Sequence, residues 1–524
     1  MLIRDAGTFW ELIERRAELD PGRRMLVDEQ DRELTFGQLR DDALRVAAGL
    51  VGLGVGPGSP VSWQLPTRID TVVVCAALCR IGAVQNPVIH LYRERELGFA
   101  MAQTGATHLV VPGVWRGTDY AALAERAGAE RGVSPQLVVL DQGLPEADPA
   151  ALDAVAVPAA DDSIRWIYYT SGTTSDPKGV CHTDGTLMAG GWGMVAALGL
   201  TAEDVGTVAF PIAHIGGADM LVGLLMTGGS AVMVEAFNPP ESLALFRRHD
   251  VTMFGGGPAF YLACLNEQRK DPGSPVLPRL RIMSGGGAPK PPELHYEVMR
   301  EIGGRGVVHG YGMTESPMIA SGTPDDTDDQ LANTEGRPVE GAEIRVVRTD
   351  GSEAAPGQEG EVRVRGPMVF KRYTDPELTG AAFDEKGFFR TGDLGRLRPD
   401  GHLTLTGRLK DVIIRKGENI SAREIEDLLY EHPKVLDVAV IGLPDPERGE
   451  RVCAVVQANP GEAPLEFTEM VGFLKEAGLM IQKIPEQLMI RDEMPRNSTG
   501  KIVKNTLREE YASTGSDRGA GAGS

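Results

Sequence analysis

The sequence is poor in cysteine and has no long apolar runs. Its five cysteines lack the paired spacing of a secreted disulfide framework, so buried structural thiols are expected rather than disulfides. The N-terminus lacks the apolar segment and cleavage site of a signal peptide. The longest apolar stretches, 71–78 and 220–226, are too short to span a bilayer. We therefore expect no integral membrane segment and a cytoplasmic location.

Basic side chains are also under-represented. Lys and Arg number 53 against 74 Asp and Glu, which gives a formal net charge of −21. Nucleic acids and anionic membranes attract basic proteins, so neither is expected as a partner. A polyanionic small molecule would need local Lys and Arg residues, or a divalent cation, to bind to so acidic a chain.

The length of 524 residues exceeds that of a single ordinary core, so two or more domains are expected. Strand-like and helix-like segments alternate up to residue 235, which predicts an α/β fold with parallel-rich sheets. Short strands separated by turns over 342–369 predict a small β subdomain, and the segments after 410 predict a compact α+β domain. The predicted domains are 1–409, 410–511 and a disordered tail at 512–524.

Two capping boxes predict helix starts. Thr35 is followed by Gln38, and Ser421 by Glu424, and apolar residues with one-face spacing follow each pair. Further helix-like segments are 71–78 and 468–477. Predicted strands are 60–64, 107–111, 136–140, 230–235, 412–414, 435–441 and 452–456.

A segment rich in hydroxyls and glycine, TSGTTSDPKG at 170–179, follows an apolar run at 164–169 that predicts a buried strand. Loops at the carboxyl ends of such strands bind ligands in open α/β sheets. Glycine N–H groups, hydroxyls and a lysine suit a polyphosphate, and the candidate residues are Thr170, Ser171, Gly172, Thr173, Thr174 and Lys178. The composition also suits a solvated linker, and the Gly-Lys-Ser/Thr end of a Walker loop is missing. The loop alone leaves both interpretations open.

Further polar islands follow along the chain: FPIAHIGG (210–217), HGYGMTES (309–316), FRTGDLG (389–395), GRLKDVIIRKGENISAREIE (407–426) and PRNSTGKIVK (495–504). In order and spacing, the sequence resembles the adenylate-forming enzymes, which include acyl-CoA synthetases, nonribosomal peptide adenylation domains and beetle luciferases. The resemblance covers about residues 30 to 507. It favours phosphate binding by the 170–179 loop over a linker.

The resemblance implies an AMP-forming acid–thiol ligase, an acyl-CoA synthetase of the fatty, aromatic or alicyclic acid type. Such an enzyme converts a carboxylic acid and ATP to an acyl-adenylate and pyrophosphate, then transfers the acyl group to coenzyme A and releases AMP. The expected partners are a small carboxylic acid, ATP and coenzyme A, with Mg²⁺ as cofactor, and a homodimer is left open. The alternatives are a stand-alone enzyme that loads a carrier protein, an oxidative luciferase-like activity, and a non-catalytic nucleotide-binding module.

The resemblance also implies roles for single residues in nucleotide binding. Glu315, with Thr170 as a second contact, matches the position that holds Mg²⁺ beside the phosphates, and hard oxygen ligands suit that ion. Asp393 matches the acid that binds the ribose hydroxyls, and Arg408 accompanies it. The other implied ATP contacts are Gly287, Ala288, Pro289, Tyr311, Gly312 and Thr314.

Three residues near the C-terminal end receive implied roles in the two half-reactions. Lys501 matches the lysine that contacts the substrate carboxylate and the α-phosphate during adenylation. Lys410 matches the hinge about which the small domain turns, and Gly417 matches the glycine beside the tunnel for coenzyme A. A module that only binds nucleotide is disfavoured, because the sequence retains Lys501 together with Glu315, Asp393 and Arg408.

His214 matches a family residue that closes the acyl pocket during adenylation and moves aside for the thiol. Ile215 follows it, where amino-acid-activating domains have an Asp that binds the ammonium, so amino-acid activation is disfavoured. Gly256 and Gly257 are expected to line the acyl pocket and to leave room for a bulky or medium to long apolar acid. These glycines also suit a simple turn at the end of a strand.

The phosphate loop departs from the family pattern at Ser175, where glycine usually follows the paired threonines. If that position requires a positive φ, serine adds strain on the order of 1 kcal/mol. Every side chain assigned to phosphate contact is nevertheless present, so the interpretation stands.

Overall fold

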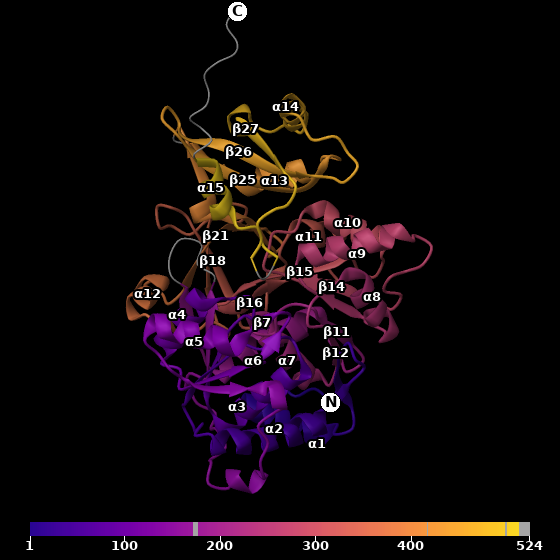
Figure 1. Ribbon diagram of the computed structural model, residues 1–524. Helices are drawn as coiled ribbons and strands as arrows, with labels where there is room; N and C mark the ends of the chain where they lie inside the picture. Colours follow the sequence, from indigo (N-terminus) through magenta and orange to yellow (C-terminus); the bar gives the residue numbers. More distant parts are fainter. Residues whose placement is uncertain (171–176, 417, 498–499, 513–524) are drawn as a thin grey trace, which may run out of the picture. The chain divides into compact units, whose positions relative to one another are not determined.

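The protein is described by a computed structural model covering residues 1–170, 177–416, 418–497 and 500–512 (Figure 1). The chain forms two compact units. The first contains Met1–Pro289, Leu294–Ile344 and Val364–Phe389, and the second contains Lys290–Glu293, Arg345–Arg363 and the described part of Arg390–Ser524. The predicted α/β class, with a large N-terminal and a small C-terminal part, is confirmed. The domain boundary at 409/410 stays a prediction.

A seven-stranded sheet forms one part of the first unit. Its central strands are parallel, because β3 pairs in parallel with β4 and β5, and β4 with β9. The edge formed by β9, β10 and β20 is antiparallel. In spatial order the strands are β20 (Arg372–Tyr373), β10 (Lys178–His182), β9 (Trp166–Thr170), β4 (Val84–Pro87), β3 (Pro60–Trp63), β5 (His108–Val111) and β8 (Gln136–Val139).

Two further sheets complete the main framework of this unit. The five-stranded sheet has the order β13 (Met253–Gly255), β14 (Ile282–Gly285), β15 (Val307–Met313), β16 (Ser316–Ser321) and β17 (Arg337–Pro338), with β13, β14 and β15 parallel. The four-stranded sheet has the order β11 (Val205–Val208), β12 (Ser230–Met233), β1 (Arg24–Val27) and β2 (Glu33–Thr35). A small hairpin joins β6 (Val114–Trp115) to β7 (Thr118–Asp119).

Helices cover these sheets, and Figure 1 shows α1, α2 and α3 side by side at the indigo end of the chain. The helix α3 is buried almost all round, as its nearly uniform apolar sequence predicts. The helices are α1 (Phe9–Leu19), α2 (Phe36–Gly52), α3 (Ile69–Ile81), α4 (Glu94–Thr104), α5 (Tyr120–Arg131), α6 (Asp184–Leu198), α7 (Ile215–Thr227), α8 (Pro239–Arg248), α9 (Pro258–Lys270), α10 (Pro292–Glu301), α11 (Asp328–Asn333) and α12 (Pro376–Ala382), with 3₁₀ turns η1 (Leu140–Gln142) and η2 (Pro149–Leu152).

The second unit is built around two sheets. One has the order β18 (Glu343–Val347), β19 (Gly360–Arg365), β21 (Phe389–Leu397) and β22 (Leu403–Arg408). Its first two strands lie within the predicted β subdomain at 342–369, and the other two extend the sheet beyond the predicted bounds. In the other, β24 (Glu418–Ser421), β23 (Val412–Arg415), β26 (Gly449–Ala458) and β25 (Val435–Asp445) follow in order, and β27 (Gln487–Arg491) pairs with β26. The helical segments are η3 (Leu409–Asp411), α13 (Ala422–Tyr430), α14 (Phe467–Glu476), η4 (Ile481–Lys483) and α15 (Lys504–Ala512).

The two predicted capping boxes have different outcomes. At the start of α2, the Thr35 hydroxyl accepts from Gln38 N at 3.2 Å and the Gln38 side chain accepts from Thr35 N at 2.8 Å, so this box is confirmed. Ser421 precedes α13 but makes no side-chain cap, because its hydroxyl donates to the Thr406 carbonyl at 2.5 Å. The second box is therefore wrong: a tertiary acceptor competes with the helix N-terminus.

All five cysteines are buried and free, as expected. In the part of the chain that the structure describes, no helix combines the length and apolar character needed to cross a membrane. Residues 513–524 of the predicted tail lie outside the described residues.

Candidate active site

The strand before the phosphate loop ends at Thr170, and the strand after it begins at Lys178. These two residues are direct partners across the antiparallel β9–β10 hairpin. Because β9 runs parallel to β4, Thr170 at the end of β9 lies at the carboxyl edge of the sheet, where ligands bind in such sheets. The candidate residues Ser171, Gly172, Thr173 and Thr174, and the departure at Ser175, lie outside the described residues.

Lys178 and Glu315 are connected through a tyrosine that the sequence did not single out. The Lys178 ammonium lies 5.3 Å from the centre of the Tyr373 ring. The Tyr373 hydroxyl donates to Glu315 Oε1 at 2.7 Å. Burial, reinforced by the charge of Glu315, raises the pKa of Tyr373 far above its ordinary value, so the hydroxyl keeps its proton. Tyr373 therefore orients the carboxylate that the sequence assigns to Mg²⁺.

The backbone around Thr314 and Glu315 is fixed by hydrogen bonds from two directions. His182 Nε2 lies 2.7 Å from the Thr314 carbonyl oxygen, which can only accept, so Nε2 carries the proton. Burial lowers the pKa of His182 to about 4 and keeps the ring neutral near pH 7. From the other side, Phe370 N donates to the Glu315 carbonyl at 2.8 Å. The turn between β15 and β16 that carries the predicted metal ligand is thus held from both sides.

Glycines allow the backbones at the carboxyl ends of β13, β14 and β15 to approach one another closely. A Cβ atom on Gly285 would lie 1.6 Å from the Gly256 carbonyl oxygen, and one on Gly286 would lie 2.4 Å from that of Gly310. Gly312 is equally restricted, with the Pro317 carbonyl oxygen 2.0 Å from its missing Cβ. The segment that resembles the adenine-binding strip begins at this edge with Gly287, whose φ of +82° is a conformation that glycine adopts readily.

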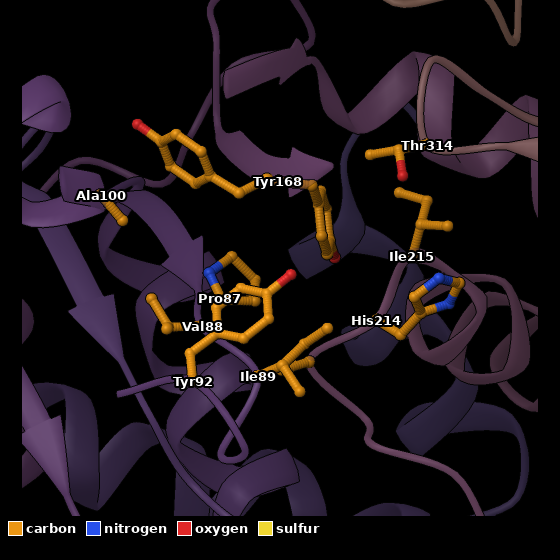
Figure 2. A pocket seen from close by; sticks show the side chains of 11 residues that line it. Pro87, Val88, Ile89, Tyr92, Ala100, Tyr168, His214, Ile215 and Thr314 are labelled. Atoms are coloured by element: carbon orange, nitrogen blue, oxygen red, sulfur yellow. The ribbon is translucent and has the colours of Figure 1, made fainter. Parts of the chain in front are cut away.

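A small apolar pocket lies beside Thr314 in the first unit. Figure 2 shows Val88, Ile89 and Tyr92 on one side and His214, Ile215 and Thr314 on the other. The pocket also contains Pro87, Ala100, Tyr168, Tyr169 and Ala213. The sequence pointed to His214 and Thr314 but not to residues 87–92. Residues 87–92 are far from 214 and 314 in the chain, and only the fold brings them to the same pocket.

His214 is the N-cap residue of α7, and its Nδ1 accepts from Gly216 N at 3.3 Å. Burial lowers its pKa to about 4, so the ring is neutral near pH 7. Since Nδ1 accepts, the proton is on Nε2, which makes His214 an uncharged donor in the wall of the pocket.

Gly256 and Gly257 lie at the end of β13 and are not among the eleven residues of this pocket. The Gly256 carbonyl accepts from the Tyr261 hydroxyl at 2.7 Å. The backbone angle φ of Gly256 is +152°. Gly257 is the N-cap of α9, with the Gly286 carbonyl oxygen 3.5 Å from its missing Cβ. Their role in binding the acid stays a prediction.

The second unit brings its predicted residues together around Asp393. Asp393 and Arg408 are direct cross-strand partners in β21 and β22, and Arg408 Nε lies 2.8 Å from Asp393 Oδ1. The carboxylate is only 3% exposed, and Asp393 N donates to the Thr391 hydroxyl at 3.1 Å. A fixed carboxylate of this kind can accept hydrogen bonds from a pair of sugar hydroxyls.

Lys501 belongs to the same unit and lies within the electrostatic influence of Asp393, Arg408 and Lys410. Its backbone closes a turn, since Asn497 N donates to the Lys501 carbonyl at 2.8 Å and Lys501 N donates to Asn497 Oδ1 at 2.9 Å. Burial, together with the positive charge of Arg408, lowers the pKa of Lys501 to about 7. Burial and Arg408 also lower the pKa of Lys410. Gly417, the predicted tunnel glycine, lies outside the described residues.

The donor set of the first unit fits a Mg²⁺ ion that is shared with a nucleotide. Within the described ranges, no three His, Cys, Asp or Glu side chains gather as a complete metal site. Mg²⁺ commonly takes one or two carboxylates and completes its octahedron with phosphates and water. The Glu315 carboxylate, held by Tyr373, and the Thr170 hydroxyl are ligands of this kind.

Comparison with known proteins identifies the class. Residues 13–374 match the AMP-binding enzyme family, and residues 424–501 match the AMP-binding enzyme C-terminal domain. The chain belongs to this family, and the resemblance stated from the motifs is confirmed.

Two curated relatives cover nearly the whole chain. It is 32% identical to the medium-chain fatty-acid–CoA ligase of Escherichia coli, over 96% of this chain and 89% of that protein. It is 34% identical to the salicyl-AMP ligase / salicyl-S-ArCP synthetase of Mycobacterium tuberculosis, over 93% of this chain and 88% of that protein.

Solved structures agree in fold. ATP-bound MatB from Rhodopseudomonas palustris matches with a TM-score of 0.85 and 30% identity, over 96% of this chain and 99% of that chain. The o-succinylbenzoate coenzyme A synthetase of Bacillus subtilis, in complex with ATP and a magnesium ion, matches with a TM-score of 0.80 and 28% identity, over 95% and 98%.

Proposed function

We propose that the protein is an AMP-forming acid–thiol ligase, which converts a carboxylic acid and ATP to an acyl-adenylate and pyrophosphate and then transfers the acyl group to coenzyme A with release of AMP. The observation that carries this proposal is the family match over both parts of the chain, combined with polar residues suited to each step. Relatives named as acid–CoA ligases agree with it.

The first half-reaction brings two anions together, a carboxylate and a triphosphate, so positive charge has to be supplied where they meet. Bound Mg²⁺, held by Glu315 and Thr170, would neutralise charge on the phosphates. Lys178 adds a cation at the phosphate hairpin, and Asp393 with Arg408 orients the ribose. Lys501, when protonated, would donate to the substrate carboxylate and to an oxygen of the α-phosphate, while a carboxylate oxygen attacks the α-phosphorus and the bond to the leaving pyrophosphate breaks.

The second half-reaction needs a thiol to reach the acyl carbon. We assign to His214 the closing of the pocket during adenylation, to Lys410 the hinge of the C-terminal domain, and to Gly417 the passage of the pantetheine arm. The proposed domains are 1–409 and 410–511. A neutral His214 suits this task, because a charged ring would be strongly stabilised by solvent and would resist return to an apolar wall.

The experiment that tests the function is a panel of straight-chain, aromatic and alicyclic acids assayed with ATP and Mg²⁺ for release of pyrophosphate and AMP, with and without coenzyme A. We expect pyrophosphate from the adenylation step and a thiol-dependent formation of AMP. If no acid causes ATP to be split into AMP and pyrophosphate, the proposal is wrong.

A second acceptor has support from one relative, which is named as both a salicyl-AMP ligase and a salicyl-S-ArCP synthetase. The acceptor of this chain could then be a carrier protein instead of free coenzyme A. Comparing the rate of AMP formation with free coenzyme A and with a phosphopantetheinylated carrier distinguishes the two.

Two further expectations belong with this proposal. A cytoplasmic location suits substrates such as ATP and coenzyme A, and cell fractionation checks it. A homodimer stays a prediction that light scattering of the purified protein checks.

A further inference from the structure

Asp219 is a buried acid in an otherwise apolar helix. It lies in α7, where it is only 4% exposed, and its Oδ1 is enclosed and has no hydrogen-bond partner among the described residues. Burial is the sole cause of a rise in its pKa to about 8. Near pH 7 the side chain is therefore mainly a neutral carboxylic acid, which can donate one hydrogen bond and accept others.

Asp219 is not one of the eleven residues that line the apolar pocket of Figure 2, but it lies one helical turn beyond Ile215, which is one of them. Ile215, which lines that pocket, precedes Asp219 by four residues on α7, so the two share one face of the helix. The Cα–Cβ bonds of a helix tilt toward its N-terminus, which here is the His214 end. Tyr168, another residue of the pocket wall, lies close enough to be affected by the charge of Asp219.

The surroundings of Asp219 leave room for its carboxyl group without pairing it. Gly190 of α6 faces it, and a Cβ there would lie 3.0 Å from Asp219 Oδ1 and 2.9 Å from Pro317 Cβ. Gly191 packs against Val222, one turn further along α7. The absent side chain of Gly190 thus makes space for a polar group that has no evident structural task.

We propose that Asp219 is a specificity-determining residue, which hydrogen-bonds a neutral hydroxyl or keto group on the acyl chain of the carboxylic acid. The inference rests on the proposed function and specifies its substrate class: an acid that is mainly apolar but carries one oxygen function away from the reacting carboxylate. Four helical residues correspond to about 6 Å along the axis from Ile215 to Asp219. The hydroxyl or keto group of the substrate is therefore expected several bonds from the reacting carboxylate of the same substrate.

The apolar pocket explains why such a group would be selected. A hydroxyl buried among Ile89, Tyr168 and Ile215 is unfavourable unless it finds a partner, and the carboxyl of Asp219, whose Oδ1 has none among the described residues, would supply one where the acyl chain reaches it. Conversely, an acid without the oxygen function leaves Asp219 unpaired in the complex. Sites built to hydrogen-bond a substrate hydroxyl discriminate strongly against analogues that lack it.

The test compares octanoic acid with its hydroxy and oxo derivatives at successive chain positions, using the full-length enzyme with ATP and Mg²⁺. The readout is the ratio of kcat/KM for pyrophosphate release between each derivative and the parent acid. We expect at least one position at which the derivative is preferred by about tenfold or more. In Asp219→Leu that preference should disappear, whereas Asp219→Asn, which still donates and accepts, should keep most of it.

A structural effect of the substitution would lower kcat/KM for both acids alike and leave their ratio unchanged. Val222→Ala on the same helix is the matched control for such an effect, and the ratio should not change in it. Asp219→Ala is the second variant if the leucine side chain prevents folding, as judged by circular dichroism. An equal ratio in wild type and in both apolar variants would overturn the proposal, as would a stronger preference for an amino derivative, which would indicate that the carboxylate binds a cation.

Calorimetric binding of the same acids separates this inference from the proposed function. One outcome is that no acid is turned over, but a hydroxy or oxo derivative binds more tightly than octanoate to the wild type and not to the apolar variants of Asp219. In that case the ligase proposal fails and the role of Asp219 stands. If turnover occurs with the same ratio in all variants, the ligase proposal stands and the role of Asp219 fails.

Discussion

Replacing Lys501 by arginine is expected to change the pH dependence of adenylation. Burial and Arg408 lower the pKa of Lys501 to about 7 in the protein. With that pKa, about half of the free enzyme carries the ammonium at pH 7 and about one tenth at pH 8. If the proposed role needs the charged form, kcat/KM for pyrophosphate release should fall about tenfold per pH unit above pH 7, because kcat/KM reports the ionisation of the free enzyme.

Lys501→Arg separates this effect from the ionisation of the substrates. A guanidinium stays protonated throughout the range, so the variant should be slower than wild type but should show no decline between pH 7 and pH 9. The assay is coupled release of pyrophosphate at a subsaturating concentration of a good acid, with ATP and Mg²⁺ held constant. Identical pH profiles for the two proteins would refute the assignment of the titration to Lys501.

The same residue should separate the two half-reactions. Lys501→Ala is expected to reduce pyrophosphate release by about 10²–10³-fold, the effect typical of removing one donor to a developing charge. It should still transfer the acyl group of a supplied acyl-adenylate to coenzyme A. Lys483→Ala is a matched control, since that lysine pairs with Glu424 at 2.6 Å and has no assigned role. Equal losses in both half-reactions would contradict the proposed role of Lys501.

Three further substitutions test other parts of the site. Tyr373→Phe removes the 2.7 Å hydrogen bond to Glu315 and should weaken the apparent Mg²⁺ affinity about tenfold or more in a metal titration, whereas an unchanged titration would show that Tyr373 does not orient the metal ligand. Asp393→Asn should raise the KM for ATP but not for the acid; equal rises in both would count against ribose binding. Asp219→Asn should stabilise the protein in urea unfolding, increasingly from about pH 4 to pH 8. In the wild type, the Asp219 carboxyl ionises near its ordinary pKa in the unfolded chain, whereas burial raises its pKa to about 8 in the folded protein. Between these two pH values, the free energy of unfolding of the wild type should therefore fall with rising pH, by about 1.4 kcal/mol per pH unit at most. A difference independent of pH would contradict the raised pKa.

Local sequence rules predicted most of the elements because the residues that decide them are neighbours in the chain. Thr35 and Gln38 are three residues apart, and their capping box is present in the structure. The rule failed at Ser421, whose hydroxyl found the Thr406 carbonyl instead. Here the competing acceptor comes from another strand, and a local motif contains no information about it.

In the site, too, features set by neighbouring residues could be predicted, and features set by distant residues could not. Glu315 and Lys178 stand out within short motifs, but the tyrosine that connects them does not, because Tyr373 lies 58 residues beyond Glu315. The strand pairing of Val180 with Tyr373 brings it there, and a single sequence gives no sign of that pairing. The family resemblance predicts which residues take part, whereas the structure shows which neighbours hold them.

Asp219 was the clearest signal that sequence reasoning passed over. An acid within the apolar segment IGGADMLVGLLM is costly to bury, and helix periodicity alone places it on the face of Ile215. What the sequence could not reveal is whether a cation or donor elsewhere in the fold satisfies it. The structure answers that question for Oδ1, since it finds no partner among the described residues.

Lys501 and Asp219 are shifted in opposite directions, and both shifts favour the uncharged form. Burial explains both, because a low-dielectric environment penalises an ammonium and a carboxylate equally. The two groups differ in what can reverse the shift. An arriving carboxylate and α-phosphate would restore the charge of Lys501, whereas a neutral hydroxyl would satisfy Asp219 without ionising it. At pH 7 the free protein thus keeps Asp219 mainly neutral and Lys501 about half protonated, and the chemistry of the substrate determines whether Lys501 becomes fully charged.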